Sequence, residues 1–149
     1  MEIAIHRGEN QIGGNIIEIS TDKTSILLDV GRELDEEEVR LPDIDGLFDD
    51  PSFDAVFISH YHGDHIGLAY YIDKRIPLYL GEASARIVQA SDAYKNTETI
   101  HPAGFLAHGK PIPIGDITVT PFLCDHSTFD SYMILICLGN DKILYTSDY

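Results

Sequence analysis

The sequence has few cysteines, few basic residues and no long apolar run. Two cysteines in 149 residues are too few for a disulfide framework. No apolar stretch approaches the roughly 20 residues that a membrane helix needs. The N-terminus also lacks the basic start and apolar segment of a secretory signal. A reduced, cytoplasmic protein is the simplest interpretation.

Basic residues are outnumbered, with 10 Lys and Arg against 25 Asp and Glu, which gives a formal net charge of −15. This charge opposes contact with phosphate backbones over most of the surface. It does not exclude a nucleic-acid substrate, because bound divalent metal ions would invert the charge locally. The acidic run at residues 33–38 is expected to be a solvated helical or loop face.

The length and the hydrophobic content of 44% are typical of one soluble globular domain, or of part of a larger one. No internal repeat, low-complexity tract or linker is visible. Strand-forming runs and helical segments follow one another without strict alternation, which predicts an α+β or mixed α/β layered fold. Strands are expected at 1–6, 14–19, 25–30, 54–58, 77–80, 116–123, 132–138 and 142–146, and helices at 66–72 and 82–94.

Residues 54–58 form a nearly continuous apolar run, which is typical of a strand buried on both faces. Directly after it, His60, His62, Asp64 and His65 fall within six residues. Loops at strand ends are where a rigid scaffold presents functional groups. Imidazole and carboxylate are the ligands that zinc prefers when no thiolate is present. The cluster therefore predicts a metal site, and the alternative is a surface loop of ordinary polar residues.

The spacing within this cluster suggests two metal positions. His60 and His62 are two residues apart, so an extended backbone points both side chains the same way and lets them share one ion. Asp64 and His65 lie near the start of the next helix, where they can turn toward a second position. Gly63 is expected to supply the backbone freedom of a tight loop. One zinc ion takes about four ligands. These four residues could therefore all bind one ion or be distributed between two, and their spacing alone does not decide.

The cluster resembles the signature of the metallo-β-lactamase superfamily, and the resemblance extends along most of the chain. Residues 13–18, 26–31 and 114–116 are similar to the opening strands and a later turn of family members. Asp-His-Ser at 125–127 and Tyr-Thr-Ser-Asp at 145–148 are most similar to the branch of ribonuclease J and related RNA-processing nucleases. The resemblance implies the N-terminal half of an αβ/βα four-layer sandwich, with a mixed β-sheet and flanking helices.

The resemblance also implies a two-zinc hydrolytic centre, with iron or manganese as alternatives. A metal-bound hydroxide would attack a phosphodiester of RNA or DNA, or another ester, and Asp64 would orient it or take its proton. Asp29, at the end of its strand, is the candidate partner that orients a metal-bound histidine. The implied ligands are His60, His62 and His126 for the first ion, and Asp64, His65 and a bridging Asp148 for the second.

Two features depart from the family pattern. Ser147 stands where members of this branch usually have glycine, so its side chain either crowds the metals or is accommodated. The resemblance covers only the first half of the family fold, and the second half supplies a further histidine to the second zinc. A fragment, a truncated product or one part of a split protein is therefore expected. Such a chain would self-associate or bind a partner that supplies the missing half.

Three functional hypotheses stay open. The first is a zinc-dependent hydrolase that acts on a phosphodiester, or on another ester or thioester. The second is a metal-binding module that holds one ion through His60, His62 and His126, assembles with a partner and is not catalytic alone. The third is a di-iron redox site. Metal content separates the first two hypotheses, and the visible absorption of bound iron identifies the third.

Overall fold

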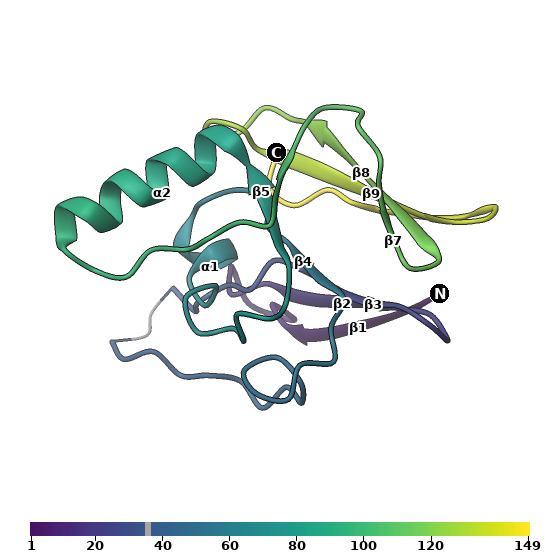
Figure 1. Cartoon of the computed structure of the whole chain (residues 1–149), viewed down its shortest axis with the longest axis horizontal. Helices are drawn as coiled ribbons and strands as arrows, with labels where there is room; N and C mark the ends of the chain where they lie inside the picture. Colours follow the sequence, from purple (N-terminus) through teal and green to yellow (C-terminus); the bar gives the residue numbers. More distant parts are fainter. Residues whose placement is uncertain (35–36) are drawn as a thin grey trace.

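The computed structural model describes residues 1–34 and 37–149, and it contains two β-sheets that pack face to face, with helices covering the other side of the first sheet (Figure 1). Strands β1, β2 and β3 of the first sheet are antiparallel, and β3, β4, β5 and β6 are parallel. The predicted mixed α/β fold class is therefore confirmed. The strands, in their spatial order, are β1 (Glu2–Arg7), β2 (Ile16–Ser20), β3 (Ser25–Leu28), β4 (Ala55–Phe57), β5 (Leu78–Gly81) and β6 (Gly104–Leu106).

The second sheet is an antiparallel meander with the order β10-β9-β8-β7. Helix α1 follows β4, and helix α2 connects β5 to β6. Within the described part of the chain, neither helix is long and apolar enough to cross a membrane. The bounds are β7 (Ile112–Ile114), β8 (Ile117–Leu123), β9 (Tyr132–Leu138), β10 (Asp141–Tyr145), α1 (Gly63–Ile66) and α2 (Glu82–Lys95).

Strand β4 contributes to two separate hydrophobic cores. Ala55 and Phe57 pack between the two sheets, whereas Val56 points the other way and packs on the helix side of the first sheet. All three side chains are fully buried. The prediction of a strand buried on both faces is therefore confirmed. Burial of a side chain such as Phe57 stabilises the fold by about 1.5–3 kcal/mol, so β4 is a firm base for the histidines that follow it.

The helix predicted at 66–72 is wrong. Helix α1 ends at Ile66, and turns follow it. A longer helix would need the Leu68 N–H to donate to the carbonyl of Asp64. Leu68 instead donates to the carbonyl of Val30, 2.9 Å away, in the segment after β3. A tertiary hydrogen bond therefore replaces the helical one and fastens this turn to the neighbouring strand.

Strands β6 and β7 were not expected from the sequence. Each has only three residues, and Gly104 and Pro113 lie within them. Glycine and proline are depleted in strands, so neither run has a strong strand signal.

The acidic run at 33–38 was expected to be solvated. Residues 35 and 36 lie outside the described residues, so this prediction can be compared with the structure only at the other positions. Glu37 and Glu38 are exposed in a bend, as expected. Glu33 pairs with Arg7 at 3.5 Å, and its side chain remains 42% exposed.

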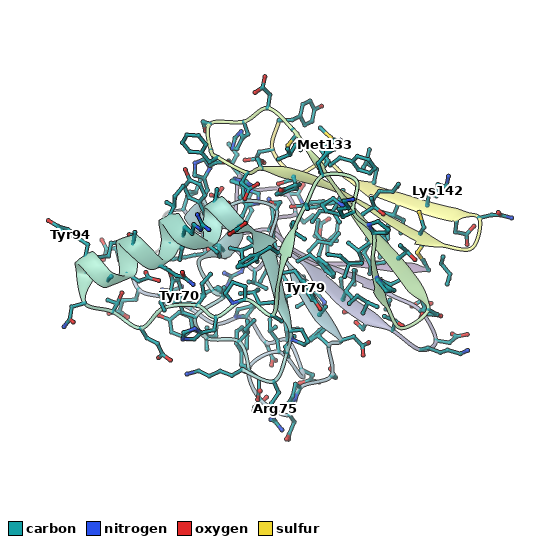
Figure 2. The ribbon with its side chains drawn as sticks, turned by 45° about the horizontal axis from the view of Figure 1, so that its top comes forward. Tyr70, Arg75, Tyr79, Tyr94, Met133 and Lys142 are labelled. Atoms are coloured by element: carbon teal, nitrogen blue, oxygen red, sulfur yellow. The ribbon has the colours of Figure 1, made fainter. Side chains whose placement is uncertain are left out.

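The outer face of the second sheet carries several incompletely buried apolar side chains. Leu144 is 54% exposed, and its cross-strand neighbour Leu135 is half-buried on the same face. Figure 2 shows Met133 on this sheet, on the opposite side of the molecule from Arg75. An apolar patch of this kind is typical of a surface that another chain or segment covers. Self-association stays a prediction, and a sedimentation measurement showing a monomer at high concentration would contradict it.

Candidate metal centre

The candidate site lies where strands of both sheets end. Asp29 follows β3 and His60 follows β4; these strands are parallel, so their carboxyl ends meet at one edge of the first sheet. Such edges are the usual ligand-binding positions of parallel sheets. His126 comes from the loop between β8 and β9, and Asp148 follows β10. Residues distant in the sequence therefore converge at one end of the sandwich.

His60, His62 and His126 form what we call the three-histidine group. Nε2 of His60 lies 3.1 Å from Nδ1 of His62, which lies 3.4 Å from Nε2 of His126. Two nitrogens that each lie about 2.0–2.1 Å from a tetrahedral zinc ion are about 3.3–3.4 Å apart. The spacing of the three nitrogen atoms therefore fits ligands of a shared ion.

His65, Asp64 and Asp148 form what we call the mixed group. Nε2 of His65 lies 3.4 Å from Oδ2 of Asp148 and 3.7 Å from Oδ2 of Asp64. This nitrogen is buried and makes no hydrogen bond within the described structure. Buried polar atoms without a partner are rare, and this one faces two carboxylates, which suits a shared cation. Oδ2 of Asp148 is also 3.8 Å from Nε2 of His126, so it lies between the two groups.

The buried carboxylate of Asp29 orients the mixed group through the ring nitrogen of His65 that points away from the other ligands. Its Oδ1 accepts the N–H of Ser59 at 2.7 Å. Its Oδ2 accepts the Ser59 hydroxyl at 2.8 Å, Nδ1–H of His65 at 2.7 Å and the Tyr145 hydroxyl at 2.6 Å. Burial and the charge of Asp29 raise the pKa of Tyr145, so its phenol remains a hydrogen-bond donor. The expected contact between Asp29 and a histidine of the cluster is present at His65, and metal binding by that histidine stays a prediction.

The same network determines which nitrogen of His60 faces the site. Because the Asp29 carboxylate only accepts, the Ser59 hydroxyl donates to it and is left to accept Nδ1–H of His60, 3.0 Å away. His60 then presents an unprotonated Nε2 to the three-histidine group. Burial, together with the neighbouring His65, lowers the pKa of His60 to about 4. The ring is therefore neutral near pH 7, as a metal ligand must be.

The two groups differ in their electrostatics. Burial and the neighbouring His126 lower the pKa of His62, so the three-histidine group favours neutral rings. Burial also acts to lower the pKa of His65. The hydrogen bond to Asp29 and the nearby carboxylates outweigh this effect and raise that pKa. The mixed group therefore has an excess of negative charge that attracts a cation.

Two glycines let neighbouring segments approach Asp64. A Cβ atom on Gly31 would lie 1.8 Å from the carbonyl oxygen of Asp64, and one on Gly13 would lie 2.5 Å from its carboxylate. Gly63 is different: it has helical backbone and open space around it. The expectation that Gly63 supplies special backbone freedom is therefore wrong. Close contacts with Asp64 require glycine at positions 13 and 31.

Ser147 is accommodated without crowding the ligands. Its hydroxyl donates to Oγ of Ser59 at 2.7 Å and so joins the network beneath the site. Its φ of +51° is in the left-handed region, which favours glycine. Glycine, which the family resemblance leads us to expect at this position, would adopt this conformation without strain.

Tyr145 is a site residue that the sequence does not indicate. Its contact with Asp29 joins residues 116 positions apart, and a tyrosine near the end of a strand is ordinary on pattern alone. The spacing of the histidines gives no indication of it.

The comparison with known families agrees with this geometry. The family model described as the metallo-β-lactamase superfamily matches residues 10–149. The chain belongs to the metallo-β-lactamase superfamily. The resemblance found in the histidine cluster is therefore confirmed.

Two curated relatives carry ribonuclease names. The chain is 29% identical to a probable RNase MJ4 of Methanocaldococcus jannaschii, over 99% of this chain and 39% of that protein. It is 26% identical to a ribonuclease J of Helicobacter pylori, over 95% of this chain and 22% of that protein. The expected similarity to the ribonuclease J branch is confirmed, although the chain spans two-fifths or less of the length of these relatives.

Two solved structures have a similar fold. The structure of a protein of unknown function from Enterococcus faecalis V583 matches with a TM-score of 0.85 and 25% identity, over 98% of this chain and 43% of that chain. The metallo-β-lactamase fold protein YhfI from Bacillus subtilis matches with a TM-score of 0.66 and 20% identity, over 98% of this chain and 62% of that chain.

Proposed function

We propose that this chain provides the metal-binding portion of a two-metal hydrolase that cleaves phosphodiester bonds in RNA. The observation that carries the proposal is the convergence of three imidazole nitrogens beside the buried, unpartnered Nε2 of His65, with Asp148 between the two groups. The names of the ribonuclease relatives favour RNA over other esters.

The donor atoms suit a divalent metal. Imidazole and carboxylate ligands favour zinc, and the mixed group also suits iron or manganese. When bound, such ions would supply an activated water and neutralise negative charge on the phosphodiester. The proposed ligands are His60, His62 and His126 for one ion, and Asp64, His65 and a bridging Asp148 for the other.

Asp64 would orient the attacking water and take its proton. Its side chain is 14% exposed and lies 3.7 Å from Nε2 of His65, so it faces both the ligand group and the solvent. Its backbone carbonyl accepts the N–H of Asn15 at 3.1 Å, which fastens this residue to the loop before β2. That contact supports a fixed direction for the Asp64 carboxylate.

The charge of the chain makes RNA binding depend on the metal. A formal net charge of −15 repels a phosphate backbone. Two divalent ions would reverse the sign of the potential at the end of the sandwich where the ligands meet. RNA binding should therefore be weak in the metal-free protein and strengthen when zinc is added.

Metal analysis combined with an RNA cleavage assay tests the proposal. The zinc-loaded protein is expected to hold close to two ions per chain and to cleave an end-labelled single-stranded RNA. Asp64→Ala should cleave about 100-fold more slowly or worse, with an unchanged circular dichroism spectrum. Asp22→Ala is the control, because Asp22 is exposed in the turn at the opposite end of β3. Cleavage of a carboxylic ester but not of RNA would overturn the substrate assignment.

A second candidate function is a one-metal binding module that is not catalytic alone. The mixed group favours this alternative, because His65 is its one imidazole that the three-histidine group does not share, and its Asp148 side chain is 45% exposed. The ion there would be held by fewer and more solvated ligands than in the three-histidine group. One ion per chain together with no cleavage of RNA or esters would decide for the module.

A further inference from the structure

Helix α2 has no cap of its own, and a side chain from the other sheet supplies one. Gly81 is the N-cap residue and has no side chain that could accept a hydrogen bond from the first turn. Asp130, in the loop between β8 and β9, takes this role: its Oδ2 accepts the N–H of Ala83 at 2.8 Å. Such an acceptor usually belongs to the N-cap residue itself. An aspartate 47 residues away in sequence therefore caps α2.

The loop that carries Asp130 is fastened at neighbouring points as well. Oδ1 of Asp130 accepts the hydroxyl of Tyr132 at 2.7 Å. The Ser84 hydroxyl donates to the carbonyl of Phe129 at 3.2 Å. The N–H of Tyr132 donates to the carbonyl of Ser59 at 3.0 Å. The last residues of the loop are thus tied both to α2 and to the segment that leads into the histidine cluster.

Gly81 is needed for this arrangement. A Cβ atom at position 81 would lie 2.1 Å from Oδ2 of Asp130. The φ of Gly81 is −62°, which other residues adopt readily, so conformational freedom does not require the glycine. The missing side chain leaves α2 uncapped and at the same time makes room for the carboxylate.

His126 lies in the same loop, four residues before Asp130. His60 and His62 share one backbone segment after the first sheet, whereas His126 comes from the second sheet. The 3.4 Å separation of His126 Nε2 from His62 Nδ1 therefore depends on how the loop is held against the first sheet. Metal–ligand distances tolerate errors of only about 0.2 Å.

We propose that Asp130 is a positioning residue for the metal centre: by capping α2 across the two sheets, it holds the β8–β9 loop where His126 completes the three-histidine group. The proposal rests on the metal-binding function proposed above. The proposed role of Asp130 differs from that of a purely stabilising helix cap in one respect. A cap supplied locally by residue 81 would restore the helix but would leave the loop unanchored.

This difference defines the experiment. Asp130→Ala removes the cap and the anchor together. Adding Gly81→Ser returns a local cap, because serine is a preferred N-cap residue, and the backbone of residue 81 already has the extended ψ of 146°. The two closest contacts at position 81 are with the carboxylate oxygen and Cγ of Asp130, which alanine no longer carries. The remaining contact, 3.0 Å to Cβ of residue 130, requires only a small shift of the loop. The readouts are the melting temperature of the metal-free protein and zinc affinity, measured by competition with a chromophoric chelator.

We expect Asp130→Ala to lower the melting temperature by about 2–4 °C and to weaken the tighter zinc site about 10–100-fold. The double variant should regain most of the melting temperature while its zinc affinity stays weak. Asp130→Asn keeps an acceptor for Ala83 and should bind zinc almost as the wild type does. If Asp130→Ala is too unstable to purify, wild type, Asp130→Asn and the double variant make the same comparison.

The matched control is Asp54→Ala. Asp54 is exposed and accepts the N–H of Ser25 at 2.9 Å, at the start of β3 and away from the ligands. Its removal should cost some stability and leave zinc affinity unchanged. Recovery of both melting temperature and zinc affinity in the double variant would show that Asp130 is only a cap, and would overturn the proposal. A wild-type protein that binds no zinc would overturn the proposed function and this inference together, and no variant would then differ from it.

Discussion

The three-histidine group and the mixed group are neighbours, yet different parts of the fold hold them in place. The first draws imidazoles from both sheets, so its geometry depends on how the β8–β9 loop is anchored. The second has His65 on the short helix α1, with Asp29 fully buried beneath it. The first group is therefore sensitive to the position of the β8–β9 loop, and the second to a buried hydrogen-bond network.

The largest effect is expected from Asp29→Ala, which breaks the support of the mixed group. The substitution leaves the hydrogen-bond donors of Ser59, His65 and Tyr145 without their shared acceptor. Removing one partner from a buried charged network costs about 3–5 kcal/mol. Urea unfolding of the metal-free protein would measure this loss. Zinc content should also fall from about two ions per chain to one, and a loss below about 1 kcal/mol would contradict the network.

His60→Ala should affect both groups, because the Nε2 side of His60 is close to each of them. Losing a direct ligand should weaken zinc binding by more than the roughly 10–100-fold expected for an indirect partner. Elemental analysis after dialysis would show fewer than one ion per chain. His101→Ala is the control, since His101 is exposed in the segment between α2 and β6. Retention of one ion in His60→Ala would show that His60 serves only one group, and retention of two ions would show that neither site needs it.

Tyr145→Phe tests the comparison more finely. It removes one of the three donors to Oδ2 of Asp29 and leaves every proposed ligand in place. A hydrogen bond to a charged group contributes about 1.5–3 kcal/mol to the free energy of unfolding, so the support of the mixed group should weaken. The zinc ion of the mixed group should then be lost before that of the three-histidine group. Isothermal titration with zinc would resolve the two ions. Tyr94 is 92% exposed at the far end of α2 (Figure 2), so Tyr94→Phe should change the affinity for neither zinc ion. Equal weakening of both ions would contradict separate supports.

Ser147→Gly should have the smallest effect. Glycine relieves a left-handed conformation that costs a serine about 1–2 kcal/mol, and it removes the hydrogen bond to Ser59, which contributes about 0.5–1.5 kcal/mol. The two contributions oppose each other, so the free energy of unfolding should change by less than about 1 kcal/mol, with zinc content unchanged. A large gain in zinc affinity would show that the serine crowds the site after all.

The buried strand β4 and the ligand cluster after it could be predicted, because a local sequence pattern indicates both. An apolar run followed by four potential ligands within six residues needs no distant partner to be recognised. His126 and Asp148 were predicted from family resemblance, because neither has a companion nearby in the sequence.

Features that depend on contacts between distant segments could not be predicted. The helix expected at 66–72 was wrong because Leu68 donates to Val30, outside any local pattern. Tyr145 and Asp130 act on residues 116 and 47 positions away. Pairings of this length depend on the packing of both sheets, which no short window of sequence contains.

The ligand groups lie at the boundary between the two sheets, so a bound metal ion would couple the stability of the protein to the metal supply. An ion bound by both His62 and His126 would cross-link the layers and stabilise the folded state by about 2.7 kcal/mol when free metal is 100 times the dissociation constant. In a metal-starved cell this boundary would open more often, and proteases would remove the chain faster. Scarcity would then reduce the abundance of the protein, and the metal would be released for other uses.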